Sequence, residues 1–396
     1  MKGGKVWSTV VDYFLILSAV IGVGFASGKE ISVFFFDFGK VSLFSLVCFG
    51  LLYIYLFYVV SYVKNKLELH TYNQFNAKIF GGLSKLSTIV MLVNFAITCA
   101  GMLAGADYLF ETFFGIGYKI PSLILSVLVF LLLRGGVQKI RTVANFIIPV
   151  MIVTIVINSI GNINPTNVHF VVCDQSGAVA VFYGLLFGVN NFVAALPVLF
   201  EVKVKAKGKL MAILTICLVV LLNILVLASN NFSTDMPMFE LSANISPAFY
   251  YIYFATLVMA LFSTLMICSY NMQTILCKQK TWFGSSAIVL FNLILSQVGY
   301  AFIVQYLYVA SGVISAIFVL ALIVMIVINL AKFKAGNQPQ IYSQNFSFWQ
   351  LIIDKNLTIC KLIKTGLKNF VCEKIALNLS FKNHNKYIKL SQKQNT

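Results

Sequence analysis

Long apolar runs recur along the chain from near residue 8 to about residue 331. Most of them are about 17 residues or longer, and a bilayer core about 30 Å thick is crossed by about 20 helical residues. Inside a bilayer the backbone must satisfy its own hydrogen bonds, so such runs are helical, whereas barrel strands are shorter and alternate in polarity. The runs therefore predict an all-α integral membrane protein. The composition agrees, because 60% of the residues are hydrophobic and 10% are charged, against about 25% charged in soluble domains.

Ten transmembrane helices account for these runs, and together they form one domain over residues 1–331. The predicted spans are 8–36, 41–63, 84–110, 118–134, 138–160, 176–200, 209–230, 246–277, 283–303 and 306–331.

The basic residues gather on alternate loops, and this pattern orients the helices. The net charge is +17, and membrane proteins concentrate Lys and Arg in their cytoplasmic loops. The cation-rich side carries Lys2, Lys5, Lys64, Lys66, Lys78, Lys85, Arg134, Lys139, Arg141, Lys203, Lys205, Lys207, Lys209, Lys278, Lys280 and the basic C-terminal residues. The other side carries Lys40 and Lys119 together with Asp37, Asp107, Glu111, Asp174, Asp235 and Glu240. We therefore predict a plasma-membrane protein with both termini in the cytoplasm, which requires an even number of spans. The positive charge is then an orientation signal, and we predict no nucleic-acid-binding surface.

Residues 332–396 differ in composition from the spans and are rich in Lys, Asn and Gln. Within them, the stretch 346–370 places apolar residues on one helical face and lysines largely elsewhere. One interpretation is an interfacial helix held by anionic lipid. The other is a partly disordered cytoplasmic tail.

The first span is too rich in glycine to be one straight helix. Gly22, Gly24 and Gly28 lie within seven residues, and the pair Lys29-Glu30 follows inside the apolar stretch. Each glycine weakens a helix by about 1 kcal/mol relative to alanine. Unwound backbone at membrane depth is tolerated where it is buried in protein or lines a cavity. The pattern therefore predicts a discontinuous helix.

The sixth span repeats this pattern five helices later. Its segment Tyr183–Phe192 contains two glycines and the adjacent amides Asn190 and Asn191, with Pro197 further on. Interrupted spans at matching positions in two halves indicate the binding site of a transporter. The two motifs are offset by five spans, an odd number, so the second half is inverted. The halves, about 8–160 and 176–331, therefore form a 5+5 inverted repeat. The alternative is close helix packing, because Gly24 to Gly28 and Gly184 to Gly188 both have the spacing G-x-x-x-G.

The first-helix motif resembles a known family. The sequence from Gly22 to Glu30, followed by Phe34-Phe35, is similar to the first-helix signature of the YkvI-type membrane proteins. These are allied to the amino acid–polyamine–organocation superfamily, which has the LeuT-type fold. The resemblance covers the ten spans and excludes the C-terminal residues. It implies a central site between helices one, three, six and eight.

The resemblance also implies that backbone amides around Gly22, Gly24 and Phe25 face a substrate carboxylate. Free N–H groups and a positive dipole end at a half-helix N-terminus supply an independent reason. On helix three, Asn94 and Thr98 lie one turn apart and either line the same cavity or make interhelical hydrogen bonds. The predicted substrate-binding residues are Gly22, Gly24, Phe25, Gly28, Asn94, Thr98, Tyr183, Gly188, Asn190 and Asn191.

A sodium site is implied on helix eight. The sequence Ala260-Leu261-Phe262-Ser263-Thr264 looks like the sodium site of sodium-coupled members of this fold. Carried over, the ligands are the carbonyls of Ser18, Ile21 and Ala260 with the hydroxyls of Ser263 and Thr264. The alternative is that the two hydroxyls bond back to carbonyls of their own helix.

Glu30 is the other candidate for ion coupling. An acid inside a span is a functional suspect, and Glu30 either carries a coupling proton or complements the adjacent half-helix. It could also pair with Lys29, or Lys29 with another neighbour. Proton-coupled relatives can place a lysine midway along helix five, but here Lys139 and Arg141 lie near its start and no lysine is central.

No motif of an enzyme, a metal centre or an ATP-driven pump is present in the sequence. The eight cysteines are scattered singly, which predicts neither a disulfide framework nor a cofactor site. We predict a secondary transporter that moves an amino acid or similar small zwitterion by alternating access, driven by Na+ or H+. The alternative is a sensor of the same fold that binds this ligand without transporting it. The sequence makes no prediction of oligomeric state.

Overall fold

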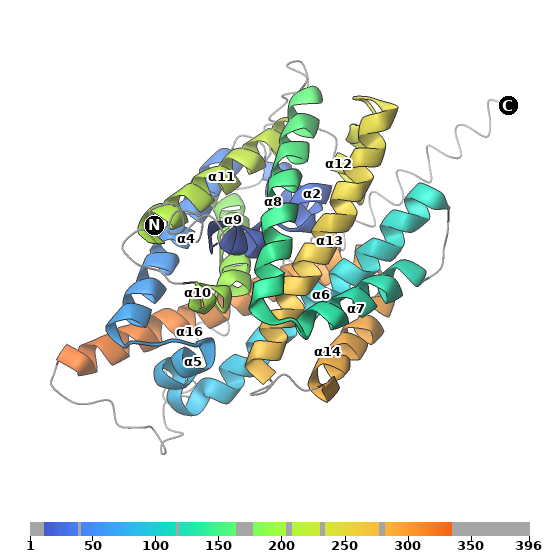
Figure 1. Ribbon diagram of the computed structural model, residues 1–396. Coiled ribbons are helices and arrows are strands. Elements are labelled where there is room, and N and C mark those ends of the chain that lie inside the picture. The colour runs from blue at the N-terminus through green and yellow to red at the C-terminus, as the bar shows by residue number, and fades with distance from the viewer. Residues whose placement is uncertain are drawn as a thin grey trace, which may run out of the picture. The chain divides into compact units, whose positions relative to one another are not determined.

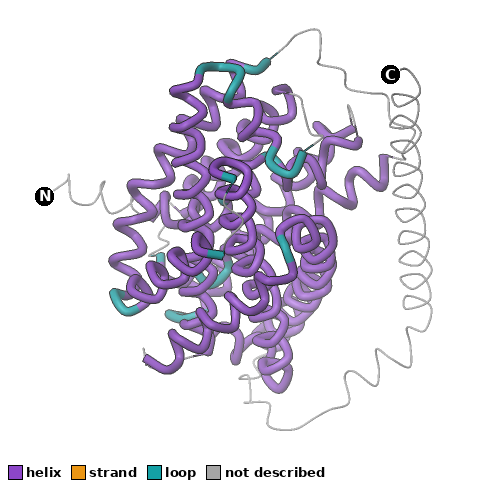
Figure 2. The backbone as a smooth tube through the Cα atoms, turned by 90° about the vertical axis from the view of Figure 1, so that its right-hand side faces the viewer, coloured by secondary structure: helices purple, strands orange, loops and turns teal. Residues whose placement is uncertain are grey.

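Every element that the computed structural model describes is a helix (Figure 2). The described residues are 12–38, 41–115, 119–163, 177–202, 208–229, 234–276 and 282–334. All of them belong to the unit Met1–Ile341. The predicted tail beyond Lys334 lies outside the described residues, as do the basic loop at 203–207 and the N-terminal lysines. The predicted all-α class is confirmed for the part of the chain described.

The helices follow one another along the chain. They are α2 (Val23–Ser27), α3 (Lys29–Phe35), η1 (Phe36–Phe38), α4 (Val41–Lys66), α5 (Tyr72–Phe80), η2 (Gly81–Leu83), α6 (Ser84–Phe114), α7 (Ile120–Leu133), α8 (Gly136–Gly161), α9 (Gly177–Ala195), α10 (Val198–Glu201), α11 (Gly208–Ser229), α12 (Pro237–Ser242), α13 (Pro247–Leu276), α14 (Trp282–Leu295), η3 (Ser296–Val298), α15 (Tyr300–Phe302), η4 (Ile303–Leu307) and α16 (Tyr308–Lys334).

Six helical stretches are long and apolar enough to cross a membrane. They are Val41–Lys66, Tyr72–Phe114, Gln138–Gly161, Gly177–Ala195, Pro247–Leu276 and Tyr300–Asn329. Three shorter apolar helices, Ile120–Leu133, Ile213–Ser229 and Trp282–Val298, match three further predicted spans. Helices thus occupy every predicted span, while the number of crossings and the 5+5 inverted repeat stay predictions.

Two short helices lie between the predicted spans. α5 begins with a capping box, in which the Thr71 hydroxyl accepts from the Gln74 amide at 3.2 Å and the Gln74 side chain accepts from the Thr71 amide at 3.2 Å. This Thr-x-x-Gln signature is readable in the sequence. α12 has Pro237 in its first turn, where proline costs no hydrogen bond.

The first span consists of three helical pieces. Residues 12–20 are helical, Ile21 and Gly22 are not, and α2 then runs to Ser27. Gly28 has φ of +76° and separates α2 from α3. Only glycine adopts this left-handed conformation without strain. We call residues 21–28 the first-helix break.

The predicted interruption within Tyr183–Phe192 is wrong, because α9 continues through this segment to Ala195. The helix is interrupted instead by the turn at Leu196 and Pro197, after which α10 begins. A methyl group at Gly184 would overlap Ser45, and one at Gly188 would lie 2.9 Å from Phe49 Cδ2. The two glycines therefore let α9 approach α4 closely, which is the packing alternative.

The helices form two neighbourhoods with shared members (Figure 1). In one, α4 packs against α9 and α11; in the other, α6 packs against α7, α13 and α14. α8 contacts both α11 and α13, and α16 contacts both α9 and α6. α2 packs against α12 and α13. α3 packs against α9 and α11, so the first span contacts both neighbourhoods on the two sides of Gly28.

Candidate functional site

The first-helix break is held by α13. The Tyr253 hydroxyl donates to the Ala26 carbonyl at 2.6 Å, and both residues are fully buried. Near the middle of α13, Thr264 faces the start of the break, since a methyl group at Gly22 would lie 2.5 Å from Thr264 Oγ1. These contacts fix the position of α2 against α13 at both of its ends.

Glu30 folds back over the break. A methyl group built on Gly24 would overlap the Glu30 carboxyl carbon, so the carboxyl group packs directly on the Gly24 backbone. Glu30 is partly exposed, whereas Gly24 is buried. A side chain at position 24 would therefore displace the Glu30 carboxyl group.

Lys29 points away from Glu30. Its ammonium group forms an ion pair with Asp235 at 2.7 Å and donates to the Thr234 carbonyl at 3.3 Å. The alternative in which Lys29 pairs with a neighbour other than Glu30 is the one observed. The ion pairs of the described residues are Lys29–Asp235, Lys119–Asp107 and Arg141–Asp12, and none of them includes Glu30.

Two tyrosines that sequence reasoning missed lie within electrostatic range of Glu30. The rings of Tyr300 and Tyr308 pack on α6 at Gly105 and Gly101, where added methyl groups would lie 3.0 and 3.1 Å from them. Both side chains interact electrostatically with Glu30. Between them lies the π-helical segment η4, a deviation that frequently marks functional positions. No regular spacing in the sequence announces this segment.

A buried polar network joins α6, α9 and α16. Asn94 Nδ2 donates to Asn190 Oδ1 at 2.9 Å and to Ser315 Oγ at 2.7 Å. Ser315 and Ser311 donate to Asn190 Oδ1 at 3.1 and 3.4 Å. We call Asn94, Asn190, Ser311 and Ser315 the asparagine–serine network. Ser311 also donates to the Tyr308 carbonyl at 2.8 Å, so the network lies one turn of α16 from that tyrosine.

The sequence predicted Asn94 and Asn190 but missed the two serines. Ser311 and Ser315 have the i, i+4 spacing that places both on one helix face, and this signal was available. Thr98 donates to the Asn94 carbonyl at 3.1 Å. Asn191, in contrast, donates to the Phe187 carbonyl of its own helix at 2.9 Å.

The remaining predicted substrate residues make packing contacts. The Tyr183 ring lies 5.1 Å from the Phe38 ring, and the Phe25 ring lies 6.1 Å from the Phe187 ring. A methyl group at Gly28 would lie 2.7 Å from Met238 Cγ. With Gly188 against Phe49, these residues join α2, α3 and α9 to their neighbours.

The residues of the predicted sodium site are only partly brought together. Thr264 Oγ1 faces Gly22 but donates to the Ala260 carbonyl at 3.1 Å. Ser18 donates to the Leu15 carbonyl at 2.8 Å. The Ser263 hydroxyl is fully buried and has no hydrogen-bond partner among the described residues, which is costly unless a ligand satisfies it. The carbonyl of Ile21 lies at the break itself.

A second cluster closes one end of the bundle around α10. Lys64 donates to the carbonyls of Leu199 and Val202 at 2.7 and 2.8 Å, and it is only 9% exposed. Arg141 donates to the Glu201 carbonyl at 2.5 Å and lies 3.5 Å from Asp12. The Tyr270 hydroxyl donates to Glu201 Oε1 at 3.2 Å.

We call Asp12, Lys64, Arg141, Glu201 and Tyr270 the latch cluster. It connects the start of the first span, α4, α8 and α13 to the C-terminal end of α10. Cations suit this end of a helix because its last carbonyls carry partial negative charge.

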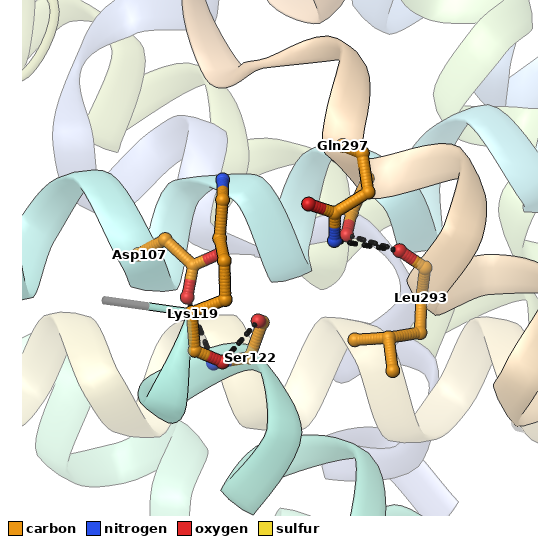
Figure 3. A network of polar contacts seen from close by, with 6 residues as sticks. Asp107, Lys119, Ser122, Leu293 and Gln297 are labelled. Carbon is orange, nitrogen blue, oxygen red and sulfur yellow. Dashed lines mark hydrogen bonds and ion pairs between the residues drawn. The ribbon is translucent and has the colours of Figure 1, made fainter. Parts of the chain in front are cut away.

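Asp107 and Lys119, both predicted on the side opposite the cation-rich loops, lie together at the start of α7 (Figure 3). Asp107 Oδ1 accepts from the Ser122 amide at 2.9 Å, and Asp107 Oδ2 lies 3.5 Å from the Lys119 ammonium group. Asp107 thereby stabilises the start of α7. Gln297, in the same view, donates to the Leu293 carbonyl at 3.1 Å. Within the described ranges, no group of three or more His, Cys, Asp or Glu side chains is placed to hold a metal ion.

Comparison with known proteins supports the resemblance seen in the sequence. No family model matches the chain. The uncharacterized membrane protein YkvI of Bacillus subtilis is 29% identical over 141 residues, which cover 35% of this chain and 41% of that protein. The match thus spans about two fifths of the curated relative.

Solved membrane transporters have the same fold at low sequence identity. A manganese transporter of Eremococcus coleocola, solved as a mutant, is 15% identical with a TM-score of 0.62, over 81% of this chain and 79% of that chain. Mhp1, a nucleobase-cation-symport-1 family transporter, is 13% identical with a TM-score of 0.53, over 76% of this chain and 74% of that chain. The chain is therefore a multi-pass membrane protein that resembles YkvI in sequence and has the LeuT-like fold of these transporters.

Proposed function

We propose that this protein is a secondary transporter that moves a small amino-acid-like zwitterion by alternating access. The observation that carries the proposal is the first-helix break, on which the Glu30 carboxyl group lies at Gly24. The asparagine–serine network lies one turn of α16 from Tyr308, whose side chain interacts electrostatically with Glu30. Ionisable groups inside a membrane bundle are costly and mark functional sites. The likeness to solved transporters supports the same class.

The latch cluster and the Lys29–Asp235 ion pair fit this mechanism as the two closures of one site. Arg141 and Asn158 lie near opposite ends of α8, about 25 Å apart at 1.5 Å per residue. Arg141 belongs to the latch cluster, whereas Asn158 donates to the Met238 carbonyl of α12 at 2.6 Å. α12 begins two residues after Asp235. The positive-inside pattern predicts that the latch cluster and both termini lie on the cytoplasmic side.

Uptake into liposomes tests the proposal directly. Purified full-length protein should accumulate a labelled amino acid from a mixed panel when a sodium or proton gradient is imposed. Empty liposomes and liposomes without a gradient are the controls. Ligand binding without uptake would instead favour the sensor, which the comparisons do not support.

Sodium coupling is the finer part of the proposal. The unpartnered Ser263 hydroxyl and the position of Thr264 beside Gly22 support it, because Na+ prefers several oxygen ligands. Ser263→Ala and Thr264→Ala should each remove the sodium dependence of uptake. Thr256→Ala is the matched control, since Thr256 lies on the same helix and makes the same bond to the carbonyl four residues earlier, at 3.0 Å. Uptake that follows the proton gradient in all of these variants would assign the coupling to protons.

A further inference from the structure

The Glu30 carboxyl group lies on the backbone of the first-helix break, at Gly24. Lys29, its neighbour in sequence, is committed to Asp235, and the ion pairs of the described residues leave Glu30 without a cationic partner. Moving a carboxylate out of water without a partner is costly. A cation that enters the break would therefore be favoured.

The groups around Glu30 are uncharged at neutral pH. Glu30 packs on Gly24 of α2 and interacts electrostatically with Tyr300 of α15, Tyr308 of α16 and Cys268 of α13. None of these side chains supplies a positive charge.

A substrate carboxylate fits poorly at the same place. The Glu30 carboxyl group already covers the Gly24 backbone, so an anion bound to the amides there would face a like charge at close range. Like charges at such separations strongly disfavour the doubly ionised state. The resemblance implied a carboxylate at these amides, whereas the position of Glu30 favours the opposite polarity.

We infer that Glu30 binds the ammonium group of the transported molecule. The inference rests on the proposed function, because it names the substrate group that this site recognises. It assigns Glu30 a binding role in place of a cap on α3, and it makes an amino group the required feature of the ligand.

Three small probes of similar size test whether the site binds an ammonium group or a carboxylate group. Ethylamine carries only the ammonium group, propionate only the carboxylate, and L-alanine both. The thermal unfolding of the purified full-length protein is measured with each probe in an amine-free buffer at constant ionic strength. The variants are Glu30→Gln and Glu30→Asp. Glu111→Gln is the matched control, because Glu111 is exposed near the end of α6.

Ethylamine should raise the melting temperature of the wild-type and Glu111→Gln proteins, and propionate should not. Glu30→Gln should weaken ethylamine binding about tenfold or more, as expected for the loss of a charge-assisted contact. Glu30→Asp should bind with intermediate affinity, which shows that a loss in Glu30→Gln comes from charge rather than from misfolding.

The inference is overturned if wild-type protein shows no ethylamine shift, or if Glu30→Gln keeps it in full. It is also overturned if propionate raises the melting temperature and ethylamine does not. The same holds if the melting temperature rises only when sodium replaces potassium in the buffer. The proposed function fails separately, when ethylamine binds in a Glu30-dependent way but no substrate accumulates in liposomes.

Discussion

At the scale of single residues, the contact between Gly24 and Glu30 explains why a glycine stands in the middle of the motif. The sequence shows three glycines in the break, but the reasons for them differ. Gly28 is needed for its left-handed backbone and Gly24 for the carboxyl group that lies on it. Gly22 leaves room for Thr264. Composition alone could not separate these three requirements.

Gly24→Ala should lower the free energy of unfolding by about 1–3 kcal/mol, because the added methyl group displaces Glu30. In a Glu30→Ala background the same change should cost less than about 1 kcal/mol, since the opposing side chain is gone. Thermal or denaturant unfolding in detergent measures both values. Gly82→Ala is the control, because a methyl group there meets nothing within 4 Å. Additive effects of the two substitutions would contradict the contact.

Alanine substitution of the neighbouring residues Asn190 and Asn191 should have different effects on stability and on the thermal shift with L-alanine. Asn190 Oδ1 accepts from three side chains, whereas Asn191 donates to its own helix. Asn190→Ala leaves buried donors without an acceptor, which costs about 1–3 kcal/mol, and should also abolish the thermal shift with L-alanine. Asn191→Ala should retain that shift. Equal ligand responses in the two variants would remove Asn190 from the site.

At the scale of elements, the similar glycine motifs of the first and sixth spans adopt different structures. Glycines interrupt the helix at residues 21–28, but Gly184 and Gly188 lie inside a continuous α9. The difference comes from tertiary contacts, because α4 lies against Gly184 and Gly188 and stabilises the helical form. Helix propensity is a weak prior that packing overrides. The real interruption, at Pro197, follows from the missing amide and the steric demand of proline.

The latch cluster makes α10 the element whose stability depends on side chains from other helices. α10 spans only Val198–Glu201, too short to be stable by itself. Arg141→Ala should increase hydrogen exchange in α10 and in residues 12–20, by about tenfold for each 1.4 kcal/mol lost. Arg134→Ala is the control, since Arg134 stacks on Trp282 at 4.2 Å outside the cluster. Unchanged exchange in Arg141→Ala would show that the cluster does not hold α10.

At the scale of the whole molecule, polar contacts lie near both ends of α8, and the proposed mechanism makes them the two closures of the site. Lys29–Asp235 lies near α12, and the latch cluster surrounds α10. Alternating access requires the two closures to open at different times. The Lys29–Asp235 ion pair and the latch cluster should therefore each lower the population of one of the two open states.

Asp235→Ala should raise the rate at which a water-soluble thiol reagent modifies Cys268, which is buried in α13 near Glu30. The pair is partly exposed, at 17% and 31% for the two side chains, so its contribution is about 0.5–1 kcal/mol and the rate should rise about two- to fivefold. The exchanged pair Lys29→Asp/Asp235→Lys should return the rate toward the wild-type value. The measurement uses a background in which the other cysteines are replaced. A faster rate in the exchanged pair than in Asp235→Ala would show that charge pairing is not the closure.

The sequence by itself determined the helical class, the positions of the helices, the first-helix motif and the resemblance to YkvI. These properties follow from local chemistry, namely the length of apolar runs and the conformations open to glycine. Tertiary structure decided which polar residues meet. Ser311 and Ser315 reach Asn190 only because α16 crosses α9, and Glu30 is left unpaired only because Asp235, over 200 residues away, lies within 2.7 Å of Lys29. Such contacts depend on how distant helices pack, and no local pattern in the chain encodes them.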